Sequence, residues 1–352
     1  MKKLKKTLAL LLSTVMVLGL SLTACGGGSS AKKEVNVFNW GVYIDESVLD
    51  EFESQTGIHV NYDTYDSNES MYGVLKNDGA DYDVVIPSDY MIGQMIEEDM
   101  LEPLDFNNIP NFDDIDPTLK NPEYDPENLY SVPYMWGLLG IIYNTTMVDE
   151  VVDSWGIMFD EKYAGDILMY DNPRDAIGIA LKYLGYSYNT TDEAQIKEAT
   201  DLLIQQFPLV QSYVMDDIFD KLQGNVAAIG SYYYGDYLTM AEVNSDLAFA
   251  LPKEGTNRYV DAMCVLKGSE NKENAEAFIN FMCTTDVGKA NAEELWYSTP
   301  LLSVREVLDP EVVDDPYAYP TDEIIAQCEI FRNLPQQTRD FYSNEWLRVK
   351  NN

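Results

Sequence analysis

Tyrosine is the residue type whose abundance and position first indicate a chemistry. The chain has 25 Tyr and five Trp in 352 residues, and several follow short apolar runs with acids nearby, at residues 39–43, 88–90 and 231–234. A ring face attracts an ammonium group, a carboxylate neutralises it through charge-assisted hydrogen bonds, and flat rings cover a methylene chain. One Tyr alone is as consistent with core packing. The clustering at expected strand ends favours a site for a flexible organic polycation.

Catalytic residue sets are scarce in this sequence. The one His, His59, lies inside an alternating strand-like run, so neither a Ser-His-Asp set nor a His-rich metal site can be assembled. No Walker-type Gly-rich loop occurs. Acid pairs are so abundant that their spacing does not identify a glycoside hydrolase. We therefore expect a protein that is not an enzyme and has no cofactor and no metal.

The elements that must position these aromatics begin with a β-α-β pattern. Residues 35–38, 58–62 and 84–86 read as strands. Helices are expected over residues 45–55 and after residue 66, where Asp66 and Glu69 have capping-box spacing. Strands alternating with helices imply a mainly parallel sheet, and ligands bind beyond the carboxyl ends of such strands. Two of those ends carry the aromatic runs at 39–43 and 88–90.

A second set of elements follows in the middle of the chain. Strands are expected at residues 138–143, 166–170, 225–230, 247–251 and 263–266. Apolar residues at helical spacing predict helices over 176–184 and around 275–282. The pattern predicts an α/β protein.

The N-terminus has the pattern of an export signal. Four Lys precede an apolar stretch over residues 8–20, which is too short and too Ser/Thr-interrupted for a membrane span. The run Leu22-Thr23-Ala24-Cys25 looks like a bacterial lipobox, which implies cleavage before Cys25 and diacylation of its thiol. The Gly/Ser residues that follow suit a flexible tether. An ordinary signal peptide with an incidental Cys is the alternative.

Charge and cysteine content constrain the partners and the redox state. The formal net charge is -37, a field that repels nucleic acid and concentrates cations. Cys264, Cys283 and Cys328 lie far apart with no C-x-x-C. We expect buried free thiols at the first two, although one disulfide stays open.

Four motifs carry a family resemblance. They are residues 37–43 (Val-Phe-Asn-Trp-Gly-Val-Tyr), 65–72 (Tyr-Asp-Ser-Asn-Glu-Ser-Met-Tyr), 82–90 (Tyr-Asp-Val-Val-Ile-Pro-Ser-Asp-Tyr) and 130–137 (Tyr-Ser-Val-Pro-Tyr-Met-Trp-Gly). In order, from about Val35 to Leu347, the chain resembles the spermidine/putrescine-binding proteins of bacterial ABC importers. The resemblance implies a two-lobed periplasmic-binding-protein fold, each lobe a mainly parallel sheet flanked by helices, hinged by crossing strands. It also implies a polyamine ligand, a transmembrane permease as partner and, as default, a monomer.

The expected organisation follows from the signal and the resemblance together. Residues 1–24 are a lipoprotein signal peptide, and 25–34 are the lipidated Cys and tether. Residues 35–138 plus 262–302 form lobe 1, and 139–261 plus 303–352 form lobe 2. The expected location is the outer face of the cytoplasmic membrane, on a Gram-positive surface or in a periplasmic space, anchored through Cys25.

The resemblance also implies ligand-binding positions, taken residue by residue. They are Trp40, Tyr43, Ser88, Tyr90, Asp175, Tyr232, Tyr259, Asp261 and Tyr297. Asp261 and Asp175 match acids that hold ammonium groups, and the rings match walls that sandwich the alkyl chain. Tyr232 and Tyr259 replace Trp of the best-known spermidine binders.

Other positions depart from the family pattern. Gly41 replaces a hydroxyl residue, Val42 stands where an acid is common, and Asn172 falls where the family often has another acid. Arg332 falls where a Gln contact is expected, and a cation there would repel a long polyamine. The pocket would then prefer a shorter diamine, or Asp89 or Asp171 would compensate.

Three other readings remain open on the sequence. Adjacent tyrosines at residues 232–234 resemble the phenolate pair of ferric-iron binders of the same fold. An extracellular hydrolase with a carboxylate pair would show turnover. A surface receptor or adhesion module reusing the fold would bind a partner regardless of polyamine.

Overall fold

The structure, a computed structural model, describes residues 33–77 and 81–352. The expected signal peptide, Cys25 and tether lie outside these residues. Glu34 to Asn352 form one unit, and none of its described helices combines the length and apolar character needed to cross a membrane. The described strands join into one continuous ladder, in the order β2-β1-β3-β9-β4-β7-β5-β6, with β10 beside β9 and β8 beside β4.

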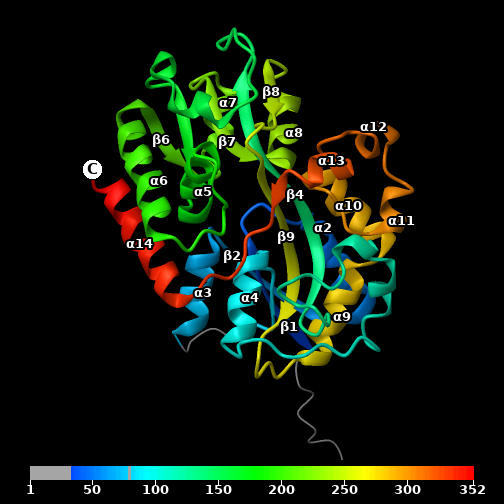
Figure 1. Cartoon of the computed structure of the whole chain (residues 1–352). Coiled ribbons are helices and arrows are strands. Elements are labelled where there is room, and N and C mark those ends of the chain that lie inside the picture. Colours follow the sequence, from blue (N-terminus) through cyan, green and yellow to red (C-terminus); the bar gives the residue numbers. More distant parts are fainter. Residues whose placement is uncertain (1–32, 78–80) are drawn as a thin grey trace, which may run out of the picture. The chain divides into compact units, whose positions relative to one another are not determined.

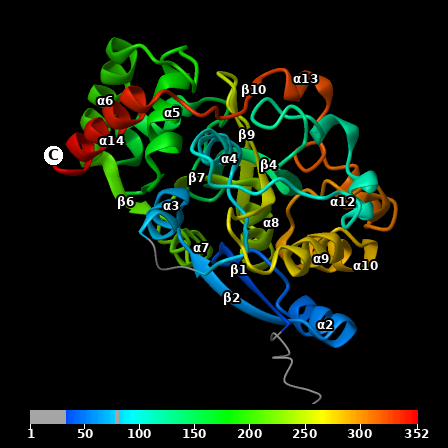
Figure 2. The same ribbon diagram turned by 90° about the horizontal axis from the view of Figure 1, so that it is seen from below.

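The first group of elements is built on three parallel strands, β1 (Glu34–Trp40), β2 (His59–Tyr65) and β3 (Val84–Val85). Because side chains alternate across a strand, Val35 and Val37 of β1 face one side and Phe38 faces the other. Helices α2 (Ser47–Thr56) and α9 (Lys272–Met282) cover the Val37 side, and α3 (Asn68–Lys76) and α4 (Asp89–Glu97) cover the other (Figure 2). Helix α10 (Thr285–Leu295) follows α9.

The second group has its own parallel strands, β5 (Ile167–Tyr170), β6 (Val210–Val214) and β7 (Ile229–Tyr233). Strand β8 (Leu247–Ala250) pairs with β4, antiparallel. The helices of this group are α5 (Pro173–Tyr183), α6 (Glu193–Gln206), α7 (Ile218–Gln223), α8 (Tyr234–Val243) and α14 (Gln336–Lys350). Helix α14 lies against α5 and α6, as Figure 1 shows at the C-terminus.

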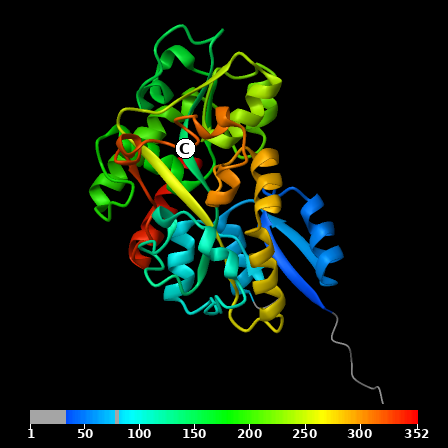
Figure 3. The same ribbon diagram turned by 90° about the vertical axis from the view of Figure 1, so that its right-hand side faces the viewer.

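Two long antiparallel strands join these groups. They are β4 (Ser131–Asn144) and β9 (Thr256–Val265), paired from Ser131↔Cys264 to Leu138↔Arg258. Val132 and Met135 of β4 pack in the first core, whereas Leu139 and Ile141 pack in the second. Figures 1 and 3 show β9 (yellow) passing between the two groups. The crossing strands expected from the sequence are therefore present.

Short elements complete the described chain. They are the 3-10 turns η1 (Pro110–Asp114), η2 (Pro117–Leu119), η3 (Trp155–Phe159), η4 (Glu161–Tyr163) and η5 (Phe207–Leu209), the helices α11 (Leu302–Arg305), α12 (Pro310–Val313) and α13 (Asp322–Ile325), and the strand β10 (Cys328–Glu329).

Local details differ from the sequence expectation at several elements: β4 and β9 are longer than the strands expected at 138–143 and 263–266, and α3 and β7 begin differently. The capping box of α3 is formed by Ser67 and Ser70, not by Asp66 and Glu69, because the chain turns into the helix one residue later. Strand β7 begins at Ile229 rather than at 225, since Asn225 has a left-handed φ of 55° that interrupts an extended strand. The three cysteines beyond residue 33 are free, with Cys264 and Cys283 buried as expected.

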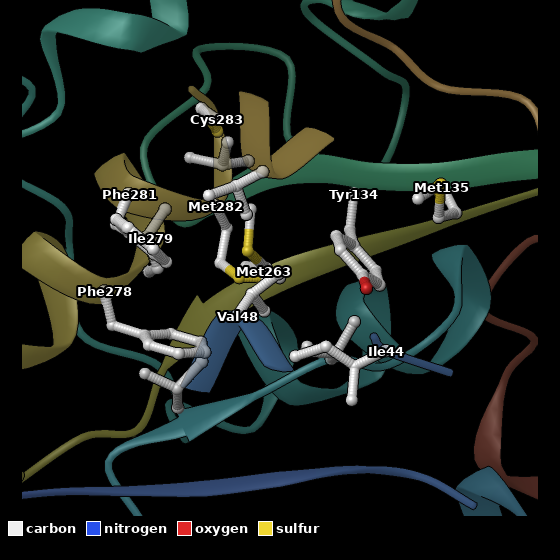
Figure 4. Packing of buried hydrophobic residues seen from close by; sticks show 14 of the residues in the cluster. Ile44, Val48, Tyr134, Met135, Met263, Phe278, Ile279, Phe281, Met282 and Cys283 are labelled. Carbon is white, nitrogen blue, oxygen red and sulfur yellow. The ribbon is translucent and has the colours of Figure 1, made fainter. Parts of the chain in front are cut away.

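Helix α9 supplies much of the first core. Figure 4 shows Phe278 and Met282 of this helix directed toward Met263 of β9 and Val48 of α2. The Phe278 ring lies edge-on to the ring of Phe52, 5.3 Å between centroids, and both side chains are fully buried. This packing joins α9, from late in the chain, to the first β-α-β unit.

Phe278→Ala should therefore lower the free energy of unfolding by about 3–5 kcal/mol, because it removes a buried ring and leaves a cavity. Urea unfolding followed by circular dichroism measures the change. Val151→Ala is the control, since Val151 is 85% exposed, and its effect should stay within about 0.5 kcal/mol. Equal midpoints for the two variants would contradict this account of the core.

Candidate functional site

The carboxyl ends of strands from both groups meet around a cavity of about 230 Å³. We call it the aromatic cavity. Its charged lining residues are all acids: Asp66, Asp216, Asp236 and Asp261. The remaining lining residues are Trp40, Gly41, Val42, Tyr43, Tyr65, Ser88, Tyr170, Met215, Phe219, Tyr232, Tyr233, Tyr259 and Tyr297.

Two rings of the first group are held at the carboxyl end of β3. The indole nitrogen of Trp40, the last residue of β1, donates to the Ile86 carbonyl at 2.9 Å. The Tyr65 hydroxyl, from the end of β2, donates to the same carbonyl at 2.7 Å. The two rings are 4.8 Å apart, centroid to centroid. A shared backbone acceptor thus fixes the orientation of both rings.

Asp261 of β9 is the most buried acid in the lining, with 5% of its surface exposed. Its Oδ2 accepts a hydrogen bond from the Tyr43 hydroxyl at 2.7 Å, whereas its buried Oδ1 has no protein partner. Burial raises the pKa of Asp261 to about 6, although the hydrogen bond from Tyr43 acts in the opposite direction. An unpaired buried carboxylate oxygen is costly, so this atom is suited to a donor from a bound ligand.

The second group contributes two acids that lie beside tyrosine hydroxyls. The Tyr232 hydroxyl donates to Asp216 Oδ1 at 3.1 Å, and the Tyr297 hydroxyl donates to Asp236 Oδ2 at 2.5 Å. Burial raises the pKa of Asp236 to about 7, and the nearby charge of Asp216 adds to the rise. A cation that enters the cavity therefore favours ionisation of Asp236.

Tyr259 forms a ring wall between the acids. Its ring centroid lies 4.7 Å from that of Tyr233 and 6.1 Å from that of Tyr297. Gly137 on β4 makes room for it, because a Cβ there would lie 2.7 Å from the Tyr259 hydroxyl. That hydroxyl is buried and has no protein partner. The cavity thus offers ring faces and unpaired polar atoms to the same ligand.

These features suit an organic cation better than a metal ion. Among the described residues, no group of three or more His, Cys, Asp or Glu side chains could hold a metal. Burial raises the pKa of both Tyr232 and Tyr233 well above the usual value, so both side chains are neutral phenols in the metal-free protein. Acids set among ring faces match ammonium groups on an alkyl chain.

Most of the expected ligand positions lie in the lining of the aromatic cavity. Those brought together are Trp40, Tyr43, Ser88, Tyr232, Tyr259, Asp261 and Tyr297, with Gly41 beside them. They come from segments as far apart in the sequence as residues 40 and 297, and the two groups that contribute them are joined by the paired strands β4 and β9.

The expected residues Tyr90 and Asp175 are placed outside the lining. The Tyr90 hydroxyl donates to Glu69 at 2.9 Å, and its ring lies under the Arg174 guanidinium. Asp175 is buried at the start of α5, and burial raises its pKa to about 8. Its Oδ1 has no protein partner.

The four other expected positions also make contacts elsewhere. Asn172 caps α5, with its Oδ1 accepting from the Arg174 backbone N–H at 2.9 Å. Asp171 forms an ion pair with Lys350 at 2.8 Å, and Arg332 forms one with Glu123 at 2.9 Å. Asp89 is fully buried and accepts from the Tyr90 backbone N–H at 2.7 Å.

Sequence reasoning did not assign the lining residues Asp216 and Asp236. Asp216 lies two residues beyond the end of β6, and Asp236 lies three beyond the end of β7. The rule that ligands bind at the carboxyl ends of strands could have found both. Strand β6 was missed because its residues, 210–214, carry polar side chains that hide its period.

The fold and this cavity define a two-lobed solute-binding protein, with crossing strands between the lobes and a ligand-sized cavity where strand ends converge. The chain belongs to the bacterial extracellular solute-binding protein family, whose model matches residues 47–321.

Individual relatives span nearly the whole chain. It is 35% identical to a spermidine/putrescine-binding periplasmic protein of Salmonella typhimurium, over 97% of each chain. A Listeria monocytogenes structure described as a spermidine/putrescine ABC transporter has a TM-score of 0.88 and 37% identity, over 90% of this chain and 99% of that one. The TpPotD lipoprotein of Treponema pallidum has a TM-score of 0.80 and 25% identity, over 90% and 99%.

The raised pKa of Asp261 predicts how stability depends on pH. An unfolded Asp ionises near ~3.9, whereas Asp261 ionises at about 6 in the fold. Between these values the folded state retains a proton that the unfolded state has lost, so the free energy of unfolding falls as pH rises. Relative to Asp261→Asn, the ligand-free protein should lose on the order of 3 kcal/mol from pH ~4 to ~7.5. Thermal unfolding across pH measures this, and parallel profiles would contradict it.

Proposed function

We propose that this protein binds a polyamine, spermidine or putrescine, outside the cytoplasm and delivers it to the permease of an ABC importer. The observation that carries the proposal is Asp261, whose buried Oδ1 is unpaired beneath aromatic rings in a cavity whose charged residues are acids. Relatives across the length of the chain are named for spermidine and putrescine, which supports the same ligand here.

The binding mode follows from the two ends of the cavity. One ammonium group donates to Asp261 Oδ1, and a second lies near Asp216 and Asp236. Trp40, Tyr259 and Tyr297 cover the methylene chain between them. Each ammonium then exchanges hydration for a carboxylate and ring faces, whereas a neutral solute of the same shape would leave the buried acids unpaired.

Closing of two lobes on the ligand completes the mechanism. Lobe 1 comprises residues 35–138 plus 262–302, and lobe 2 comprises 139–261 plus 303–352. The bond between Tyr297 and Asp236 spans these lobes, and an added Cβ on Gly41 would lie 3.5 Å from Asp216 Oδ2. Val304 and Leu308 pack with the first core, so the start of the segment 303–352 contacts lobe 1 as well as lobe 2. A ligand that contacts both lobes stabilises the closed form.

The protein acts outside the cytoplasm, anchored to the membrane. Residues 1–24 direct export and are removed, Cys25 is diacylated, and residues 26–34 tether the folded body to the outer face of the membrane. The assignment of a T. pallidum relative as a lipoprotein supports the anchor. The protein acts as a monomer and without catalysis, and the relatives are binding proteins rather than enzymes.

Calorimetric titration with spermidine, putrescine and a neutral diol of similar length tests the function. We expect one-to-one polyamine binding and no diol binding. Asp261→Asn should weaken polyamine binding by about 30-fold or more, because it removes one partner of a buried charge pair. Asp153→Asn, at an exposed ion pair with Lys253, is the matched control and should bind as wild type. No heat with either polyamine from folded, ligand-free protein would overturn the proposal.

A glycine substitution tests the ring wall without changing charge. A Cβ on Gly235 would lie 2.9 Å from the ring of Tyr297, so Gly235→Ala must displace that ring and its bond to Asp236. We expect about tenfold weaker polyamine binding, which corresponds to ~1.4 kcal/mol. Gly73→Ala is the control, since nothing lies within 4 Å of its added Cβ. Titration of both variants gives the comparison, and equal affinities would show that the Tyr297 wall does not contribute.

A further inference from the structure

A second cavity lies on the opposite face of the crossing strand β9. Successive side chains of a strand point to opposite faces. Tyr259 and Asp261 line the aromatic cavity, whereas Arg258 and Val260 line this other one. Its volume is about 400 Å³, and we call it the Arg258 cavity. Its other walls are Gly93 of α4, residues 118–124 before β4, and residues 330–333 before α14.

The guanidinium of Arg258 is poorly satisfied by the protein. The guanidinium carbon of Arg258 lies 5.9 Å from the centroid of the Trp136 ring. In the part of the chain that the structure describes, no carboxylate lies within ion-pairing distance of it. Burial lowers the pKa of Arg258, yet the group stays charged at neutral pH. Five N–H donors removed in part from water require acceptors.

Two further polar atoms near Arg258 are also unpaired. The Tyr124 hydroxyl, from a lining residue, is buried without a protein partner. Asp89 Oδ2 is buried without one as well, and desolvation raises the pKa of Asp89 well above its usual value. Asp89 and Tyr124 both lie close enough to Arg258 to influence its pKa. The Arg258 guanidinium and the Tyr124 hydroxyl both offer N–H or O–H donors to this cavity, so the missing partner is an acceptor.

The sign of the lining charge points to the same kind of ligand. The charged lining residues are Lys120, Arg258, Arg332 and Glu123, and Glu123 is already paired with Arg332 at 2.9 Å. This excess of cations occurs in a chain of net charge -37. Gly93 lets the walls approach, because an added Cβ would lie 3.3 Å from Asn333 Cβ and 3.4 Å from Tyr124 Cβ.

We propose that the Arg258 cavity binds a small oxyanion, a carboxylate or a phosphate. Arg258 provides a planar fork of N–H donors that matches two oxygens of such a group. The Tyr124 hydroxyl donates a further hydrogen bond, and Lys120 and Arg332 attract the anion at the rim. The site is distinct from the aromatic cavity in position, in sign of charge and in ligand.

The backbone connects the two cavities. Ser88 lines the aromatic cavity and forms a β-bridge with Asp261, and the next residue, Asp89, lies close enough to Arg258 to influence its pKa. Because β9 contributes lining residues to both cavities, we expect a ligand in one cavity to stabilise the strand conformation that the other uses. The anion should therefore tighten polyamine binding. This coupling rests on the proposed function, whereas the anion site itself does not.

Thermal unfolding and calorimetry with phosphate, succinate and chloride at equal ionic strength test the site in the absence of polyamine. Phosphate or succinate should raise the unfolding temperature and bind one-to-one, whereas chloride should not, and the stronger of the two identifies the class of oxyanion. Arg258→Gln should abolish this binding, and Tyr124→Phe should weaken it several-fold. Arg348→Gln, an equal charge change on α14, is the matched control and should retain it. An equal shift with chloride, or binding retained in Arg258→Gln, would overturn the proposal.

Spermidine titrations with and without saturating phosphate or succinate then test the coupling. We expect the dissociation constant to fall by about fivefold or more, and not to change in Arg258→Gln. Equal affinities would overturn the coupling. Oxyanion binding that depends on Arg258, in protein that binds no polyamine, would instead overturn the proposed function and support the anion site.

Discussion

The site depends on a carboxylate that the fold keeps out of water. Asp261 is 5% exposed and has one oxygen bonded to Tyr43 and the other unpaired. Such a group is costly in the ligand-free protein, and burial raises its pKa to about 6 as a result. A bound ammonium group removes that cost, since it provides both the opposite charge and the missing donor. Part of the binding free energy therefore comes from relieving the cost of this unpaired carboxylate, which is already present in the folded, ligand-free protein.

Asp261 lies on a crossing strand, so its interaction with a ligand affects both groups of elements. Strand β9 pairs with β4 along its length and with β3 at its end. A ligand bound to Asp261 therefore contacts a strand that both groups of elements share. The same strand presents Asp261 and Tyr259 on one face and Arg258 on the other. The two cavities, with linings of opposite charge, therefore lie on opposite faces of one strand.

The sequence was most informative where local pattern and chemistry coincide. Aromatic and acidic residues after strand-like runs located Trp40, Tyr43 and Ser88 at one edge of a sheet, and the structure places all three in the cavity lining. The pattern was less informative for Asp216 and Asp236, which follow a strand of polar residues and a run of tyrosines. Family resemblance led to Asp175 and Arg332, yet neither lines the cavity, because Asp175 lies at the start of α5 and Arg332 pairs with Glu123.

The sequence by itself predicted an α/β fold class and the kind of ligand chemistry, because hydrophobic period and residue type are local properties, whereas the crossing strands were expected from the family resemblance. It also predicted export and a lipid anchor, which lie outside the described residues. Only the tertiary structure decided which acids meet which rings. The bond between Tyr43 and Asp261 joins residues 218 positions apart, and the face of β9 that each side chain occupies is set by strand register. That register depends on pairing between distant segments, which no local pattern specifies.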